Sequence, residues 1–223
     1  MRFRFFGGNT KLERPHANWV RPPGPIAPGM RIGLLGGSFN PAHEGHVHVS
    51  EVALKRLGLD YVWWLVTPQN PLKSTQGMAS LADRVRSARL VAHHPRIVVM
   101  DIEHDFRTHY SFDTLRALQK RFPLVKFTWL MGSDNLAIFR RWHRWAEFAQ
   151  LVPIAVIQRP GTVLASLKAK PIQRFGLARI ERNLCGARTP AIAVIDGKRN
   201  AQSATAIRAS QRFAEGFVGP LPS

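Results

Sequence analysis

A glycine-rich turn between an apolar segment and an amphipathic segment constrains the fold of this chain most strongly. Residues 30–35 are short and apolar, which predicts a buried strand, and residues 47–57 carry apolar side chains at helical spacing. Gly36 and Gly37 lie between them, and the absence of a Cβ lets their backbone approach a ligand closely. The amides of the turn and the amino end of the helix would then face one point, which suits a phosphate group.

Two histidines stand at the start of the predicted helix. His43 and His46 are three residues apart, so their side chains share one helix face. Both imidazoles can donate hydrogen bonds to an anion near neutral pH, which favours a phosphate site. A zinc site would need a third and usually a fourth ligand, and Cys185, the only cysteine, has no cysteine partner. We therefore expect no metal site of the protein's own here.

Composition limits the class of protein. The chain has 223 residues, of which 45% are hydrophobic, enough for one large domain or for a domain with an appendage. A single cysteine excludes an internal disulfide and fits a reducing compartment, so we expect a cytoplasmic protein. No apolar run approaches the roughly 20 residues that a membrane span needs. The net charge of +18 favours acidic partners without choosing among them, and a solvated basic surface explains it equally well.

Segments of strand and helix character alternate along the rest of the chain. Further strands are expected at residues 61–66, 96–100, 125–131, 153–158 and 191–195. Ser80 and Asp83 predict a capping box that opens a helix to residue 94, and another helix is expected to end near residue 122. The alternation predicts a Rossmann-like, doubly wound α/β fold with a mainly parallel sheet and helices on both faces. Ligands bind at the carboxyl ends of the strands in such sheets.

Two regions are expected. Residues 1–29 hold five prolines and several arginines without sustained periodicity, which predicts a basic, loosely attached arm. An extension without function is an equal alternative. Residues 30–223 are expected to form the functional domain.

Residues 37–46 resemble the signature of the nucleotidyltransferase superfamily, G-x-F-[DN]-P-x-H-x-G-H, at every fixed position. The chain further resembles the bacterial nicotinate-nucleotide adenylyltransferases, which join nicotinate mononucleotide to ATP. That likeness rests on residues 68–73, 110–115, 132–136 with Trp142, 159–161 and 203–208. Ala204 stands where the family usually has a serine, and Ser111 where it tends to have a threonine. Neither departure removes a charged group.

The resemblance implies roles for individual residues. The expected catalytic residues are His43, His46, Lys73 and Arg208. Lys73 also follows a predicted strand, where a lysine can reach the crevice of an open sheet. Besides the two histidines, the expected ATP-binding residues are Gly36, Gly37, Ser38, Phe39, Ser203, Thr205 and Arg208. The nicotinate side is expected to involve Tyr110, Ser111, Asp134, Trp142 and Arg159, with Trp142 stacking on the pyridine ring.

The implied reaction gives nicotinate adenine dinucleotide and pyrophosphate from ATP and nicotinate mononucleotide, with Mg2+ carried by ATP and no covalent intermediate. Another adenylyl- or cytidylyltransferase, for example one acting on phosphopantetheine, is the main alternative. A nucleic-acid-binding module that uses the +18 charge is a second one, for which Trp142 and Trp145 among arginines are the only local sign. We expect no nucleic-acid or membrane partner, and a homo-oligomer is compatible with the sequence.

Overall fold

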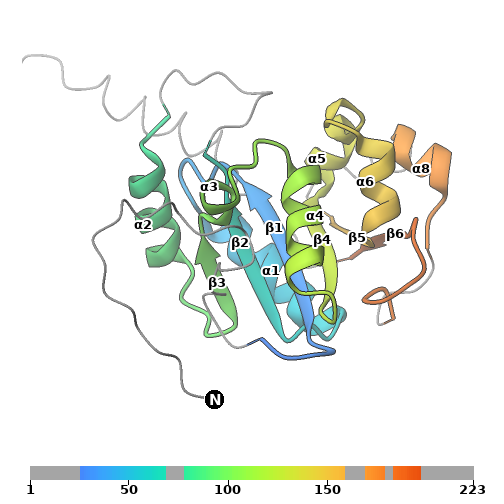
Figure 1. Cartoon of the computed structure of the whole chain (residues 1–223), viewed down its shortest axis with the longest axis horizontal. Coiled ribbons are helices and arrows are strands. Elements are labelled where there is room, and N and C mark those ends of the chain that lie inside the picture. The colour runs from blue at the N-terminus through green and yellow to red at the C-terminus, as the bar shows by residue number, and fades with distance from the viewer. Residues whose placement is uncertain (1–25, 69–77, 159–168, 179–182, 197–223) are drawn as a thin grey trace, which may run out of the picture.

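The computed structural model describes residues 26–68, 78–158, 169–178 and 183–196 (Figure 1). In these residues the strands form one sheet. They are β1 (Arg31–Gly37), β2 (Tyr61–Val66), β3 (Ile97–Met100), β4 (Lys126–Gly132), β5 (Ile154–Ile157) and β6 (Ile192–Ile195). The strand order is β3-β2-β1-β4-β5-β6, and every neighbouring pair is parallel.

Helices cover both faces of this sheet. They are α1 (Glu44–Arg56), α2 (Leu81–Val91), α3 (Ile102–Phe106), α4 (Ser111–Arg121), α5 (Ser133–Ile138), the 3-10 helix η2 (Phe139–Arg141), α6 (Trp145–Leu151) and α8 (Lys170–Phe175). Figure 1 shows α4 and α6 in front of the sheet and α1 behind it. The predicted Rossmann-like α/β fold is therefore confirmed.

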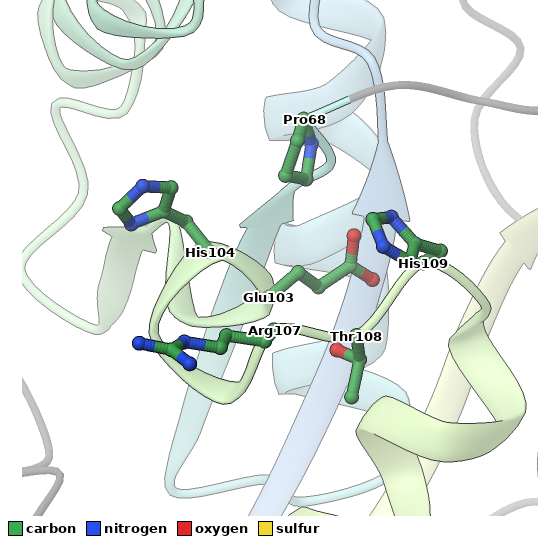
Figure 2. Close-up of a pocket in the computed structure, with 6 residues that line it drawn as sticks. All are labelled: Pro68, Glu103, His104, Arg107, Thr108 and His109. Carbon is green, nitrogen blue, oxygen red and sulfur yellow. The ribbon is translucent and has the colours of Figure 1, made fainter. Parts of the chain in front are cut away.

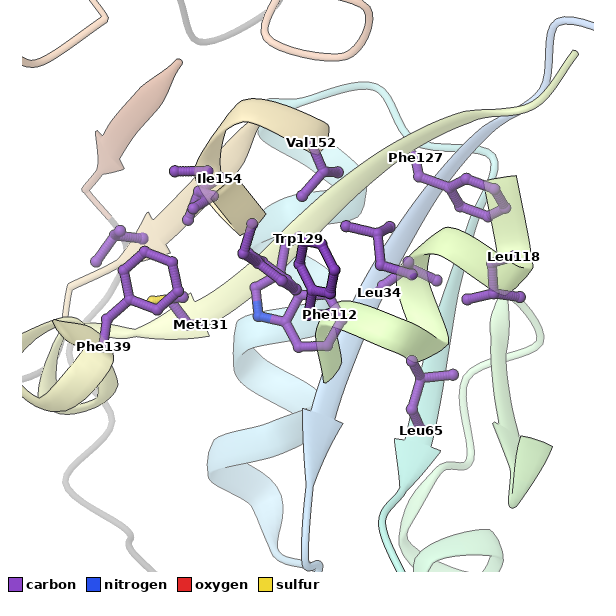
Figure 3. Close-up of a cluster of buried hydrophobic side chains, with 14 of the residues drawn as sticks. Leu34, Leu65, Phe112, Leu118, Phe127, Trp129, Met131, Phe139, Val152 and Ile154 are labelled. Carbon is purple, nitrogen blue, oxygen red and sulfur yellow. The ribbon is translucent and has the colours of Figure 1, made fainter. Parts of the chain in front are cut away.

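Side chains of each strand alternate between two hydrophobic clusters. In β2, Trp63 and Leu65 pack in the cluster with α4, whereas Trp64 and Val66 pack in the cluster with α1. Figure 3 shows the first cluster, where Phe112 of α4 lies among side chains of the strands. Because parallel sheets are buried on both faces, their strands are apolar throughout rather than alternating. This explains why the strands were visible in the sequence as continuous apolar runs.

Several predicted boundaries differ from the structure. The helix expected to reach residue 94 ends at Val91, because Ala92 leaves the helical region at ψ 60°. A helical backbone is also disfavoured at the residue that precedes Pro95. The segment after β4, for which no helix boundary was predicted, forms three short pieces, because Trp142 is extended and Arg144 is left-handed. Helices α3 and α8 were not predicted, because five- and six-residue helices are too short for a periodic pattern.

The connectivity predicts a ligand crevice between β1 and β4. These strands are paired neighbours, yet the chain passes outward through β2 and β3 before it returns to β4. The loops after β1 and β4 therefore diverge at a topological switch point, where open α/β sheets bind ligands. Among the described residues, no helix is both long enough and apolar enough to traverse a bilayer.

Candidate active site

The loop after β1 is shaped by close packing of aromatic rings. Phe39 adopts a left-handed backbone at φ 47°, and its buried ring stacks on Trp64 of β2 at 5.0 Å. A Cβ on Gly37 would lie 3.3 Å from the Phe39 ring, and one on Gly36 would lie 2.8 Å from the Trp129 ring. Packing against Trp129 therefore excludes a Cβ at position 36 unless that ring shifts, whereas a Cβ at position 37 would need only a small movement of the Phe39 ring. Their predicted approach to a ligand stays a prediction.

The two signature histidines lie side by side, with ring centroids 4.0 Å apart. His43 is the N-cap of α1, and its Nδ1 accepts a hydrogen bond from Gly45 N–H at 3.1 Å. The Nδ1 of His46 accepts from His43 N–H at 3.2 Å. Because each Nδ1 is an acceptor, the neutral form of each ring carries its hydrogen on Nε2. The backbone thus sets both imidazoles as Nε2 donors.

Three further contacts hold His46 in place. Its ring lies 4.6 Å from the Phe39 ring and 5.7 Å from the Trp64 ring. Its carbonyl accepts from Ser50 Oγ at 2.8 Å, and Trp64 Nε1 donates to the same Oγ at 2.8 Å. His43 is buried, whereas His46 is half-buried. A donor held this firmly needs little rearrangement when an anion binds.

Trp142 lies on the β4 side of the crevice. It is half-buried and packs edge-on against Trp129 at 5.9 Å and against Phe139 at 5.3 Å. Trp129 in turn fills the space next to Gly36, so the end of β1 and Trp142 are joined through one ring. Trp142 therefore belongs to the edge of the core, and stacking on a pyridine ring would use its exposed part.

Three other predicted nicotinate residues lie at the starts of helices. Tyr110 is the N-cap of α4, is 40% exposed and stacks on His143 at 4.3 Å. Ser111 is the first residue of α4, and exposed Asp134 lies in the first turn of α5, directly after β4. The Tyr110–His143 contact brings the start of α4 next to the turn that carries Trp142.

A cavity of about 500 Å³ lies at the carboxyl ends of β2 and β3 (Figure 2). Its described lining residues are Pro68, Glu103, His104, Arg107, Thr108 and His109. None of these is a predicted site residue. Figure 2 shows the Glu103 carboxylate directed toward the space between Pro68 and His109. Desolvation raises the pKa of this buried carboxyl to about 7, although a hydrogen bond from Thr114 opposes the shift.

A hydrogen-bond network joins Glu103 to the start of α4. Thr114 Oγ1 lies 2.7 Å from Thr108 Oγ1, 3.2 Å from the Tyr110 carbonyl and 3.3 Å from Glu103 Oε1. Thr114 Oγ1 donates toward Glu103 Oε1 and the Tyr110 carbonyl, and either of the two threonine hydroxyls can donate to the other. This network ends on the backbone of Tyr110 and so fixes the start of α4.

Sequence reasoning missed Glu103, Thr108 and His143. Glu103 and Thr114 are 11 residues apart and belong to different helices. His143 follows Trp142 directly, so its place beside the predicted tryptophan was the one available signal. Five predicted site residues lie outside the described residues. They are Lys73, Arg159, Ser203, Thr205 and Arg208. Most of the predicted arm, residues 1–25, also lies outside them.

Comparison with known proteins identifies the family. The sequence pattern described as cytidylyltransferase-like matches residues 34–210. A probable nicotinate-nucleotide adenylyltransferase of Parvibaculum lavamentivorans is 52% identical over 187 residues, which cover 82% of this chain and 93% of the relative. One from Methylorubrum extorquens is 51% identical over 183 residues, which cover 80% of this chain and 99% of the relative.

A solved structure shows the same fold. It is the Plasmodium falciparum nicotinic acid mononucleotide adenylyltransferase complexed with NaAD, at a TM-score of 0.61 and 16% identity, covering 81% of this chain and 83% of that one. The resemblance noted in the sequence is confirmed by the curated relatives. The chain therefore belongs to the cytidylyltransferase-like family and, within it, to the nicotinate-nucleotide adenylyltransferases.

Proposed function

We propose that this chain transfers the adenylyl group of ATP to nicotinate mononucleotide, giving nicotinate adenine dinucleotide and pyrophosphate in NAD biosynthesis. Relatives of about 50% identity bear the name of this activity. Within the structure, the observation that carries the proposal is the pair of imidazoles whose Nδ1 atoms are engaged by the backbone after β1. Two Nε2 donors beside the amino end of α1 suit a polyphosphate.

The chemistry needs no enzyme nucleophile. The second pKa of a phosphate monoester is near 6, so the phosphate of nicotinate mononucleotide is already ionised at neutral pH. One of its oxygens attacks the α-phosphorus of ATP, and the bond from that phosphorus to the bridging oxygen of the β-phosphate breaks. Pyrophosphate leaves with that electron pair. Catalysis is then positioning of the two phosphates and stabilisation of charge.

His43 and His46 would donate to the triphosphate oxygens, where negative charge builds up as pyrophosphate departs. Magnesium would enter bound to ATP and would neutralise part of the phosphate charge, and we assign it no ligand from the protein. We assign the remaining phosphate contacts to Lys73, Ser203, Thr205 and Arg208. We assign nicotinate mononucleotide to the side formed by Tyr110, Ser111, Asp134, Trp142 and Arg159.

The setting of the reaction is part of the proposal. A single cysteine fits a reducing compartment, so we place the enzyme in the cytoplasm. We propose no nucleic-acid partner, because the +18 charge is accounted for equally well by anionic substrates and a solvated surface.

A substrate panel tests the function. The protein is incubated with ATP and Mg2+ and with nicotinate mononucleotide, nicotinamide mononucleotide or phosphopantetheine, and the dinucleotide products and pyrophosphate are quantified. We expect the fastest product formation with nicotinate mononucleotide. Faster reaction with phosphopantetheine, or no pyrophosphate with any acceptor, would refute the proposal.

A further inference from the structure

Arg84 of α2 is a charged residue buried inside the fold. Only 2% of it is exposed, although its neighbours Asp83 and Arg86 lie on the surface. Arginine is almost never fully buried unless its donors are satisfied. The buried guanidinium beside the predicted phosphate loop must therefore have hydrogen-bond partners inside the fold.

Four hydrogen bonds join this guanidinium to three segments of the chain. Nη1 donates to the Ser38 carbonyl and to the Thr67 carbonyl, both at 2.7 Å. Nη2 donates to the Pro68 carbonyl at 2.8 Å, and Nε donates to the Ala79 carbonyl at 3.0 Å. Ser38 lies in the signature loop, whereas Thr67 and Pro68 follow β2. Arg84 thus fastens the signature loop to the end of the neighbouring strand.

The charge of Arg84 is not neutralised by these partners. All four acceptors are neutral carbonyls, and no carboxylate among the described residues pairs with Arg84. Arg144, by contrast, pairs with Glu147 on the surface. Burial lowers the pKa of Arg84, as desolvation does for a cation. A guanidinium nevertheless stays protonated, so a full positive charge remains next to the loop.

The carbonyl bonds also determine which way the loop amides point. The peptides after Gly37 and Ser38 are trans, so each carbonyl and the following N–H point in opposite directions. The Ser38 carbonyl faces Arg84, and the Phe39 N–H therefore points away from the guanidinium. The Gly37 carbonyl accepts from Thr67 N–H at 3.0 Å, so the Ser38 N–H points away from Thr67. A further bond, from Ala79 N–H to Asn40 Oδ1 at 3.2 Å, holds the loop on the same side.

We propose that Arg84 is a positioning residue for ATP, which turns the Ser38 and Phe39 amides toward the triphosphate and adds an uncompensated positive charge behind them. This inference rests on the proposed adenylyl transfer, because it needs the signature loop to hold a polyphosphate. Arg84 acts through the loop and does not touch the reacting atoms. No sequence pattern indicated it.

The test compares two variants, Arg84→Lys and Arg84→Met, with a matched control. Arg96 also donates to a carbonyl, that of Leu59 at 3.2 Å, but at the amino end of β2. We expect both Arg84 variants to raise KM for ATP roughly 10- to 100-fold, the scale of one to two charge-assisted hydrogen bonds. KM for nicotinate mononucleotide should change less than about 2-fold on this view, and Arg96→Met should change neither value.

Equal rises in both KM values, or a change in KM for ATP no larger than that of Arg96→Met, would overturn the inference. If neither Arg84 variant folds, amide hydrogen exchange of the wild-type protein, measured with and without ATP, tests the inference instead. ATP should then slow exchange of the Ser38 and Phe39 amides, and unchanged exchange at saturating ATP would overturn the inference. Wild-type protein that binds ATP in this way but makes no dinucleotide would refute the proposed function and leave the role of Arg84 standing.

Discussion

The two sides of the crevice are built in different ways. After β1, the two histidines are set mainly by contacts within about ten residues, such as His43 with Gly45 and His46 with Phe39, while Arg84 holds the loop from a distance. On the β4 side, distant segments meet: Tyr110 stacks on His143, and Trp142 packs on Trp129. The histidine pair is therefore specified mainly by a local sequence run, whereas the second side depends on tertiary packing. Substitutions should separate the two sides by which substrate they affect.

The largest effect is expected on the β1 side. His46→Ala should lower turnover roughly 100-fold or more, because it removes one preorganised hydrogen-bond donor. We expect the variant to keep its fold. Steady-state kinetics with both substrates at saturation measures this loss. His48→Ala is the matched control, since His48 lies on the same helix outside the signature and should tolerate the change. Near-normal turnover of His46→Ala would count against the site.

The second prediction concerns the network that fixes the start of α4. The pKa of Glu103 is raised from 4.5 to about 7, so the folded state holds a proton that the unfolded state releases between these values. The stabilisation from the protonated carboxyl is therefore present below pH 4.5 and is lost as pH rises through 7. Glu103→Gln should be more stable than wild type by about 1–3 kcal/mol at pH 8 and similar to it at pH 5.

Urea unfolding at the two pH values measures the difference for Glu103→Gln. Exposed Glu147 provides the control, because Arg144 lowers the pKa of its carboxyl and Glu147→Gln should leave this pH dependence unchanged. A stability difference between Glu103→Gln and wild type that does not vary with pH would contradict a protonated carboxyl.

A smaller effect is expected for Trp142→Phe, which keeps an aromatic ring against Trp129 but reduces the surface available for stacking. KM for nicotinate mononucleotide should rise about 3- to 10-fold, the scale of one aromatic pair, while KM for ATP stays unchanged. Measuring both constants on the same preparation sharpens the comparison between the two sides. A rise confined to ATP would place the pyridine ring elsewhere.

The smallest effect is expected for His143→Ala, which removes the ring stacked on exposed Tyr110. We expect KM for nicotinate mononucleotide to rise about 2- to 3-fold, because a partly exposed stack contributes little. His143→Phe should restore the wild-type value, since it restores a stacking surface. A failure of this rescue would show that His143 acts through its nitrogen atoms instead.

The sequence predicted what is local and periodic. The strand at Tyr61–Val66 matches the prediction, and Ser80 caps α2 as expected, with Asp83 N–H donating to its Oγ. The reciprocal half of the predicted capping box is replaced, because Asp83 Oδ2 accepts from Ser80 Oγ at 2.6 Å. The signature run predicted the turn, the helix start and the shared face of His43 and His46. These features depend on neighbours in the chain, so residue type and spacing were sufficient.

Contacts between distant residues could not be predicted. Arg84 and Ser38 are 46 residues apart, and the acceptors of Arg84 are backbone carbonyls, which every residue possesses. No side-chain type marks such a partner. The glycine at position 36 shows the same limit, because the Trp129 ring that requires it comes from another strand. Its sequence context suggested a ligand, and the structure supplies a packing reason.

Dinucleotide formation by wild type and by the double variant His43→Ala/His46→Ala, measured side by side with ATP, Mg2+ and nicotinate mononucleotide, tests the central claim most directly. We expect nicotinate adenine dinucleotide and equimolar pyrophosphate from the wild type. We expect a rate at least roughly 100-fold lower from the double variant, provided that this variant unfolds cooperatively in urea and is therefore folded. Comparable rates from the two proteins would contradict it.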